Sequence, residues 1–220
     1  MRLLLLRHAE VDGHRGDVPI TEAGAARARE VGAWLSAEGD VPVQVLYGGT
    51  RRTRETAEAL VAGWREARDE NSPPEPRDAF ALRNPDLYLA GERVTMVSSP
   101  EAFATQTASA TPDDVTASGF FSTWLSHPDR VGWWVAHAAP PGDTAAQVAD
   151  RVAAFAASLT DVPGWRGRTV VAVTHSPVLR AVALRAEGGD PGEPPYVAGY
   201  EITDPAGGQP GVRRFTPPGA

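Results

Sequence analysis

Three places in the chain put cationic or imidazole side chains directly after a short apolar run. Arg7 and His8 follow the first run, the arginines of 51–54 follow the second, and His175 follows the third. A guanidinium holds phosphate oxygens through paired hydrogen bonds, and an imidazole can attack phosphorus as a nucleophile. If the fold brings these groups together, burying so many cations requires an anion beside them. The chemistry indicated is phosphoryl transfer.

The apolar runs predict strands that are buried on both faces, as in the middle of a parallel sheet. They cover 2–7, 42–47 and 169–174, and a pattern typical of a helix comes after each of them. The carboxyl ends of parallel strands meet at one edge of the sheet, and ligands bind outside that edge. We therefore expect an α/β domain with a mostly parallel central sheet, in which the three groups of polar side chains converge.

Residues at the starts of the first two helices have expected roles. Thr21 and Thr50 are candidate caps, because a threonine hydroxyl can accept a hydrogen bond from a free backbone N–H of the first turn. The second helix begins with three arginines. Arg51 and Arg54 are expected to be exposed to solvent, and Arg52 is expected to bind the anion.

The remaining segments predict how the domain is completed. Residues 84–142 carry helical patches rich in aromatic side chains, and we interpret them as an insertion over the carboxyl edge of the sheet. Its aromatic side chains are expected to form a small core rather than a cage around a substrate. Residues 71–76 predict a loop, and 196–203 with 212–215 predict a terminal hairpin or edge strands. Since no linker divides the chain, residues 1–220 are expected to form a single domain.

Composition narrows the classes of partner. The 220-residue chain is 42% hydrophobic and 22% charged, with a formal net charge of −7 and a pI of about 5.2. An acidic chain disfavours a general nucleic-acid or anionic-membrane surface. No segment has the apolar length of a signal peptide or a membrane span, so a cytoplasmic location is expected. The expected partner is a small phosphorylated substrate, with no nucleic acid and no membrane, and an exposed edge strand near the C-terminus could pair in a homodimer.

Two residue types are absent from the chain. It contains no cysteine, and all 21 basic residues are arginine. This composition excludes thiolate nucleophiles, disulfides and cysteine-ligated zinc. It also excludes Schiff-base chemistry on lysine and the lysine of a phosphate-binding P-loop. No cluster of carboxylates accompanies the five histidines, so no metal site is expected.

Four stretches, in the order in which they occur, resemble signatures of the histidine phosphatase superfamily. Leu-Arg-His-Ala-Glu at 6–10 resembles the Arg-His-Gly motif, and 17–24 resembles the Asp-x-Pro-Leu-Thr-x-x-Gly stretch. Residues 46–57 resemble the Ser-Ser-x-x-x-Arg-Ala-x-x-Thr-Ala stretch, and 171–176 resemble the Val-x-His-Gly motif. The resemblance implies a three-layer α/β/α fold, similar to that of phosphoglycerate mutase, with an inserted helical cap region.

The resemblance also implies roles for individual side chains. His8 is the nucleophile that forms a phosphohistidine. Arg7 and Arg52 hold the transferred phosphoryl oxygens, and His175 stabilises charge in the transition state. Backbone N–H groups near Ser176 can add to the phosphoryl site. The resemblance implies neither a metal ion nor an organic cofactor.

The chain departs from the family pattern at several positions. Ala9 replaces the glycine after the predicted nucleophile, and residues 48–49, both glycine, replace the two serines. His14 stands where many members have a phosphate-contacting asparagine, and it can take that role or point into water. In the predicted insertion, Arg83 or Arg93 could bind a second anionic group of the substrate.

The largest departure concerns the general acid, which must protonate an alkoxide leaving group. Many members carry a glutamate in a Leu-Arg-Glu stretch, whereas this chain has Leu-Arg-Asn, ending at Asn84. Asp86 is the predicted substitute and is included among the catalytic residues, with Glu92 and Asp78 as alternatives. A chain without the acid would favour substrates with good leaving groups, or phosphoramidates such as phosphohistidine.

The leading hypothesis is a phosphoric monoester hydrolase of the histidine phosphatase type, acting without a metal on a small phosphorylated metabolite. Phosphoglycerate mutase activity would need a protected phosphoenzyme and a closing lid, and the altered acid region argues against it. A phosphatase of protein phosphohistidine is a third hypothesis, against which the insertion argues mildly. A non-catalytic phosphate-binding protein is the alternative outside the enzymes, and absence of turnover would favour it.

Overall fold

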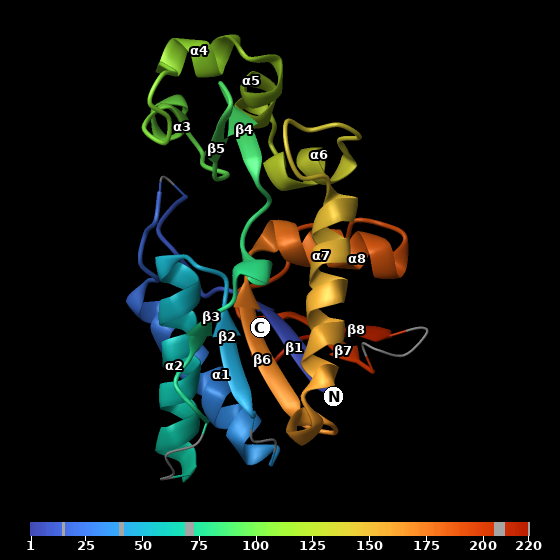
Figure 1. Ribbon diagram of the computed structural model, residues 1–220. Helices are drawn as coiled ribbons and strands as arrows, with labels where there is room; N and C mark the ends of the chain where they lie inside the picture. Colours follow the sequence, from blue (N-terminus) through green and yellow to red (C-terminus); the bar gives the residue numbers. More distant parts are fainter. Residues whose placement is uncertain (15, 40–41, 69–72, 205–209, 220) are drawn as a thin grey trace.

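A six-stranded sheet forms the middle of the molecule in the computed structural model, with the strand order β3-β2-β6-β1-β7-β8 (Figure 1). The strands are β1 (Arg2–Arg7), β2 (Gln44–Tyr47), β3 (Arg77–Asp78), β6 (Thr169–Thr174), β7 (Gly199–Thr203) and β8 (Gly211–Phe215). Strands β1, β2, β3 and β6 pair with one another in parallel. Strands β7 and β8 form an antiparallel hairpin. This arrangement confirms the predicted mostly parallel sheet and the C-terminal hairpin. The outer strand β8 is the edge at which homodimer pairing is predicted.

The structure describes residues 1–14, 16–39, 42–68, 73–204 and 210–219. The first two positions of the predicted loop 71–76 lie outside the described residues.

Strand β1 is central because both of its faces are apolar. It runs parallel to β6 on one side and antiparallel to β7 on the other. Leu3 and Leu5 pack in one buried cluster, whereas Leu4 and Leu6 pack in a second one. Successive side chains of a strand point to opposite faces, so the leucine run needs a cover on both sides. Burying each leucine contributes on the order of 1.5–3 kcal/mol, which places the run in the middle of the sheet.

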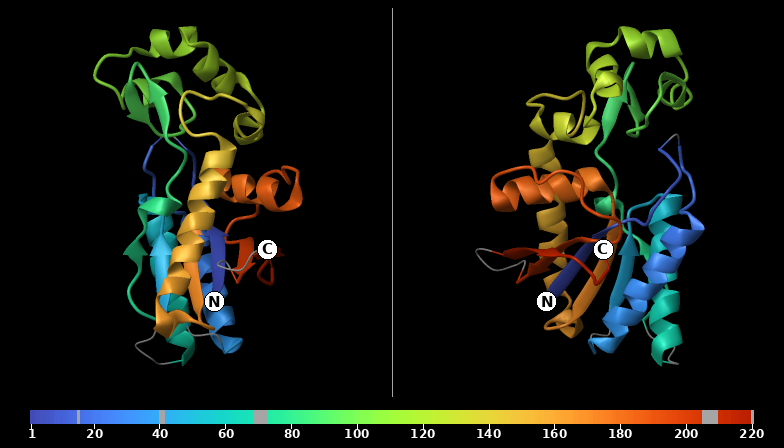
Figure 2. Two further views of the ribbon diagram at one scale, coloured as in Figure 1. Left: turned by 45° about the vertical axis from the view of Figure 1, so that its right-hand side comes forward. Right: turned by 180° about the vertical axis from the view of Figure 1, so that it is seen from behind.

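Two long helices cover each face of the sheet and complete the three layers (Figures 1 and 2). Leu4 and Leu6 face α1 (Glu22–Ala37) and α2 (Arg51–Arg68). The opposite face packs against α7 (Ala145–Ser158) and α8 (Ser176–Glu187), and the turns η2 (Leu159–Asp161) and η3 (Pro163–Trp165) follow α7. Within the described ranges, none of the helices has both the length and the apolar character that crossing a bilayer requires.

Side chains start the first two helices in different ways. The Thr21 hydroxyl accepts a hydrogen bond from the backbone N–H three residues on, as predicted. At α2, the Asp17 carboxylate accepts the Arg51 N–H at 2.7 Å, and Thr50 donates its own N–H to the Thr53 hydroxyl at 3.2 Å. A negative charge stabilises the start of a helix. The cap of α2 therefore comes from a different loop than the predicted Thr50.

Residues 84–142, which we call the cap segment, lie over the carboxyl ends of the parallel strands (Figures 1 and 2). The turn η1 (Phe80–Leu82) leads into this segment. The predicted helical patches correspond to α3 (Pro100–Ala104), α4 (Pro112–Ala117), α5 (Gly119–Ser126) and α6 (Arg130–Ala136). An antiparallel hairpin of β4 (Leu87–Leu89) and β5 (Glu92–Val94), which was not predicted, precedes them.

Aromatic side chains form much of the interior of the cap segment. The ring centroids of Phe103 and Phe121 lie 4.8 Å apart, as do those of Phe120 and Trp133. Such pairs stabilise a small core beyond the apolar area that they bury. The expectation of a small aromatic core is therefore confirmed for these four residues.

Candidate active site

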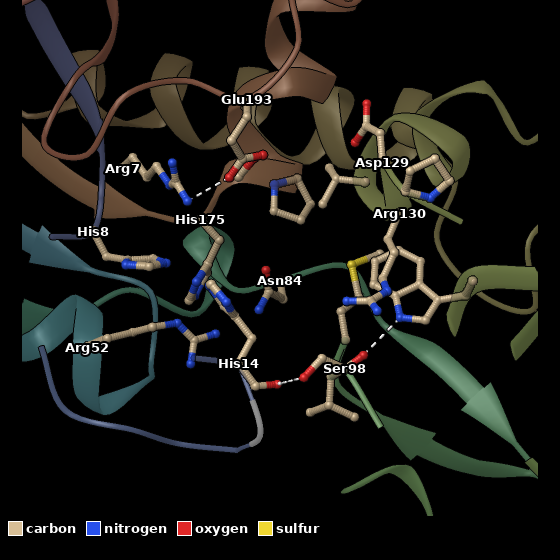
Figure 3. A pocket seen from close by; sticks show the side chains of 17 residues that line it. Arg7, His8, His14, Arg52, Asn84, Ser98, Asp129, Arg130, His175 and Glu193 are labelled. Carbon is tan, nitrogen blue, oxygen red and sulfur yellow. Dashed lines mark hydrogen bonds and ion pairs between the residues drawn. The ribbon is translucent and has the colours of Figure 1, made fainter. Parts of the chain in front are cut away.

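The carboxyl edge of the sheet brings together the side chains that follow the three apolar strands (Figure 3). The ring centroids of His8 and His175 lie 5.7 Å apart, and those of His8 and His14 lie 6.1 Å apart. Together with Arg7 and Arg52, these histidines line one side of a cavity of about 590 Å³, and residues of the cap segment line the other side. The expected convergence of Arg7, His8, Arg52 and His175 is present, and His14 lies beside them.

His8 has one ring nitrogen available for chemistry. Its backbone N–H donates to the Thr174 carbonyl at 2.9 Å, and its Nδ1 lies 2.7 Å from the Ala9 carbonyl oxygen. A carbonyl only accepts hydrogen bonds, so Nδ1 carries the proton and Nε2 carries the lone pair. Desolvation and the charge of Arg52 lower the pKa of the His8 imidazole to about 3. The ring is therefore neutral at neutral pH, in the form that can attack phosphorus.

Two buried guanidiniums flank the His8 ring. Arg7, at the end of β1, and Arg52, in the first turn of α2, are each 6% exposed. The side chains of Arg51 and Arg54 are 48% and 51% exposed and pair with glutamates of the same helix. Of the three arginines that start α2, only Arg52 lines the cavity.

The segment after α8 orients Arg7. The Nη1 group of Arg7 donates to the Pro194 carbonyl at 2.5 Å, and the guanidinium carbon lies 4.0 Å from the centroid of the Tyr196 ring. The Nη2 group lies 2.6 Å from one oxygen of Glu193, and the Ser176 hydroxyl donates to the other oxygen at 2.6 Å. A carboxylate thus contacts two residues that were predicted to hold the phosphoryl group.

His175 and Ser176 lie where β6 passes into α8, and both are buried. The Nε2 atom of His175 lies 3.3 Å from the Gly48 carbonyl oxygen, whereas the buried Nδ1 atom has no hydrogen-bond partner among the described residues. Burial and the charge of Arg52 hold the pKa of His175 well below its ordinary value. The N-terminus of α8 adds backbone N–H groups that favour an anion at this edge.

His14 lines the cavity rather than pointing away from it (Figure 3). Its backbone carbonyl accepts a hydrogen bond from the Ser98 hydroxyl of the cap segment at 3.1 Å. Desolvation, followed by the charges of Arg52 and Arg7, lowers the pKa of His14. Of the two roles open from the sequence, this position favours contact with a bound anion.

Several buried polar atoms around the cavity lack partners within the described part of the chain. They are Nε of Arg7, Nε of Arg52, Nε of Arg130, Oδ1 of Asn84 and Nδ1 of His175. Unpaired buried polar atoms cost free energy unless a ligand or water pairs with them. In the described residues, no group of three or more His, Cys, Asp or Glu side chains is arranged to hold a metal ion. The surplus of cations and unpaired polar atoms indicates an anion site.

Close packing of two backbone segments explains why position 48 is a glycine. A Cβ atom on Gly48 would lie 2.4 Å from the Leu82 carbonyl oxygen, a distance that side chains do not tolerate. The turn η1 therefore packs directly on the backbone at the end of β2. This contact accounts for one of the two glycines that replace the family's serines.

Asp86, Arg83 and Arg93 form an ion-pair cluster and are not among the residues that line the cavity. The Nη2 group of Arg83 lies 2.6 Å from Asp86 Oδ2, and Arg93 binds the same carboxylate. Although desolvation opposes the change, hydrogen bonds from the two arginines lower the pKa of Asp86. The geometry thus corrects two predictions: Asp86 is not placed to act as the general acid, and neither arginine is placed to bind a second anionic group.

The two alternative acids also lie outside the cavity lining. Glu92, in β5, accepts a hydrogen bond from the Ala108 N–H at 2.9 Å. Asp78 is exposed at the end of β3. Neither carboxylate contributes to the cavity wall.

Sequence reasoning missed four charged residues at or beside the cavity. Three of them line it, namely Glu193, Asp129 and Arg130. The fourth, Arg180, forms an ion pair with Asp129. Arg180 is 2% exposed on α8 and binds Asp129 at 2.7 Å and Asp190 at 2.5 Å. Arg180 lies within the apolar stretch 177–184 of α8, and an arginine in such a stretch indicates a buried ion pair, which is the signal that the sequence offered.

Comparisons with known proteins agree with this fold. The sequence profile of the histidine phosphatase superfamily (branch 1) matches residues 3–73 and 120–210. Similar solved structures include a mycobacterial glucosyl-3-phosphoglycerate phosphatase, with 17% identity, a TM-score of 0.63 and coverage of 97% of each chain. YhfR of Bacillus stearothermophilus has 23% identity and a TM-score of 0.58, covering 97% of this chain and 95% of that one.

A candidate alpha-ribazole-5′-P phosphatase from Escherichia coli has 17% identity and a TM-score of 0.58, covering 98% of this chain and 96% of that one. No curated protein matches the sequence. The solved structures show the fold, and the profile covers more than half of the chain. The chain therefore belongs to the histidine phosphatase superfamily.

Proposed function

We propose that this protein is a phosphatase that hydrolyses a phosphomonoester of a small metabolite through a phosphohistidine on His8. The observation that carries the proposal is the state of His8: a neutral ring with its lone pair on Nε2, between the buried guanidiniums of Arg7 and Arg52. Membership of the histidine phosphatase superfamily supports the same chemistry. Arginines supply the positive charge that phosphoryl transfer needs, so the proposal requires no metal ion.

In the first step, the phosphoryl group binds between Arg7 and Arg52, whose forked N–H donors match its oxygens. The Nε2 atom of His8 forms a bond to phosphorus while the bond from phosphorus to the ester oxygen breaks. The Ala9 carbonyl keeps its hydrogen bond to Nδ1–H and stabilises the positive charge that develops on the ring. With the proton of its neutral ring on Nδ1, the atom without a partner among the described residues, His175 can donate a hydrogen bond to a phosphoryl oxygen.

In the second step, a water molecule attacks phosphorus on the phosphohistidine. The bond between phosphorus and Nε2 breaks, and inorganic phosphate leaves with its oxygens still facing Arg7 and Arg52. His8 returns to the neutral state with the proton on Nδ1. The same cationic site therefore serves both steps, because a phosphoryl group with similar charge occupies it in each of them.

The size and lining of the cavity support a small substrate. A volume of about 590 Å³ is typical of pockets for small molecules. Opposite the cationic side, Met96, Val97 and Trp124 of the cap segment provide an apolar wall. Two of the similar structures are named for phosphatases of small metabolites, glucosyl-3-phosphoglycerate and alpha-ribazole-5′-P.

The test is release of inorganic phosphate from an aryl phosphate and from a panel of small phosphomonoesters. We expect turnover by the unmodified protein and a loss of about 10³-fold or more in His8→Ala. Folded protein that releases phosphate from no phosphoester would contradict the proposal and favour a binding protein. Transfer of the phosphoryl group to another position of the substrate would instead indicate a mutase, and release only from a phosphohistidine peptide would indicate a protein phosphatase.

A further inference from the structure

A phosphomonoester of an aliphatic alcohol needs a proton donor, because an alkoxide leaves poorly unless it is protonated. Asn84 lines the cavity at the position where many family members have glutamate, and an amide has no proton of suitable acidity. The three carboxylates considered from the sequence all lie outside the cavity lining. The proton donor must therefore be sought among other residues.

Two carboxylates belong to the described residues that line the cavity, Asp129 and Glu193. Asp129 receives two hydrogen bonds of 2.7 Å from Arg180. These bonds lower the pKa of Asp129 to about 2, although desolvation opposes them. An acid of this strength stays ionised near neutral pH and has no proton to give, so Asp129 is a poor candidate.

Glu193 lies in a different environment, on the chain between α8 and β7. One of its oxygens lies 2.6 Å from Nη2 of Arg7, and the other accepts the Ser176 hydroxyl at 2.6 Å. Its second cation, Arg180, is more distant, at 3.7 Å, and is already paired with two aspartates. The Glu193 side chain is 47% exposed, so it can exchange protons with solvent.

We infer that Glu193 is the general acid and base of the phosphatase proposed above, an inference that rests on that function. In the resting structure Arg7 pairs with the Glu193 carboxylate, and in the complex it also pairs with the phosphoryl group. Two anions that share one guanidinium repel each other, and the repulsion favours uptake of one proton by the pair. In the proposed mechanism Glu193 carries this proton as the bond to the leaving oxygen breaks.

The proton balance closes over the two steps. In the first, the bond from His8 Nε2 to phosphorus forms, the phosphorus–oxygen bond breaks, and the carboxyl proton of Glu193 passes to the departing oxygen to give the free alcohol. In the second, the Glu193 carboxylate takes a proton from water as the water oxygen attacks phosphorus. The phosphorus–nitrogen bond then breaks, and inorganic phosphate leaves with Glu193 protonated as at the start.

The experiment compares two leaving groups in Glu193→Gln, which keeps an acceptor for the Ser176 hydroxyl but has no transferable proton. The substrates are p-nitrophenyl phosphate, whose phenolate leaves without protonation, and the best alkyl phosphate of the panel. We expect kcat to fall about 10²-fold or more with the alkyl ester and less than about threefold with the aryl ester. Glu92→Gln, the same change on a carboxylate outside the cavity, is the matched control and should leave both rates unchanged.

The outcomes separate this inference from the function on which it rests. If the unmodified protein turns over neither ester, the proposed phosphatase fails. If kcat of Glu193→Gln changes by the same factor on both esters, only the inference is overturned. The Glu193 carboxylate would then merely occupy or support the phosphoryl site. Thermal unfolding checks the fold of the variant. Should it not fold, Glu193→Asp must show the larger loss on the alkyl ester, and equal losses overturn the inference.

Discussion

The two sides of the cavity differ in how their charges are balanced. On the sheet side, Arg7, Arg52 and His175 are buried and keep polar atoms without partners in the described part of the chain. On the cap side, the Asp129 carboxylate is already paired through two hydrogen bonds from Arg180. The sheet side therefore has unmatched positive charge for an anion, and the cap side chiefly has shape and apolar surface for the rest of a substrate.

The difference predicts that substitutions on the sheet side reduce activity on every substrate. Arg52→Ala removes a buried guanidinium beside His8, so we expect kcat/KM to fall about 10²–10³-fold for all phosphomonoesters tested. Arg54→Ala, on the same helix, removes a half-exposed arginine and should change kcat/KM little. Steady-state kinetics with two unrelated esters measure kcat/KM for both variants. A loss confined to one ester would show that Arg52 recognises the leaving group instead.

Arg130 is the exception on the cap side and sharpens the comparison. It lines the cavity, its buried Nε has no hydrogen-bond partner, and it has no ion pair with a carboxylate among the described residues. We expect Arg130→Ala to lower kcat/KM about 10-fold for esters that carry a second anionic group, and little for those that do not. The control is Arg93→Ala, whose guanidinium binds Asp86 outside the cavity. Equal effects of Arg130→Ala on both kinds of ester would contradict this role.

The burial of His8 predicts a pH dependence of stability. The pKa of His8 falls from an ordinary 6.5 to about 3 on folding, so the unfolded chain binds the proton more tightly. The free energy of unfolding should therefore fall as the pH drops below about 6.5, with a contribution from His8 of up to about 1.4 kcal/mol per pH unit. Urea unfolding between about pH 7 and pH 5 should show a shallower dependence for His8→Asn than for the unmodified protein. Parallel curves would mean that the folded site takes up the proton without penalty.

The sheet side of the site could be predicted from the sequence, because the spacing of apolar residues determines where the strands lie and where they end. Four leucines in succession require cover on both faces, which puts β1 in the middle of the sheet and the residues that follow it at the carboxyl edge. The same argument applies to β6 and His175. Neighbouring parallel strands end together, so the approach of His8 and His175 follows from topology.

The cap side could not be predicted in the same way. Asp86 is the nearest carboxylate to Asn84 in the sequence, but arginines close to it in the chain and across the β4–β5 hairpin hold it outside the cavity. Glu193 lies in a Gly/Pro-rich stretch without a periodic pattern, and its contact with Arg7 joins residues at opposite ends of the chain. Contacts of this kind depend on loop geometry, for which local sequence carries little signal.

The central claim is that phosphorus becomes bonded to Nε2 of His8. Protein mixed with an aryl phosphate for milliseconds and quenched in alkali, where phosphohistidine survives, can be digested and sequenced by tandem mass spectrometry. The account predicts a phosphoryl group on the peptide that contains His8 during turnover, and none in His8→Ala. Product release without a phosphoryl group on His8, or a phosphoryl group on His14 or His175 in its place, would contradict the account.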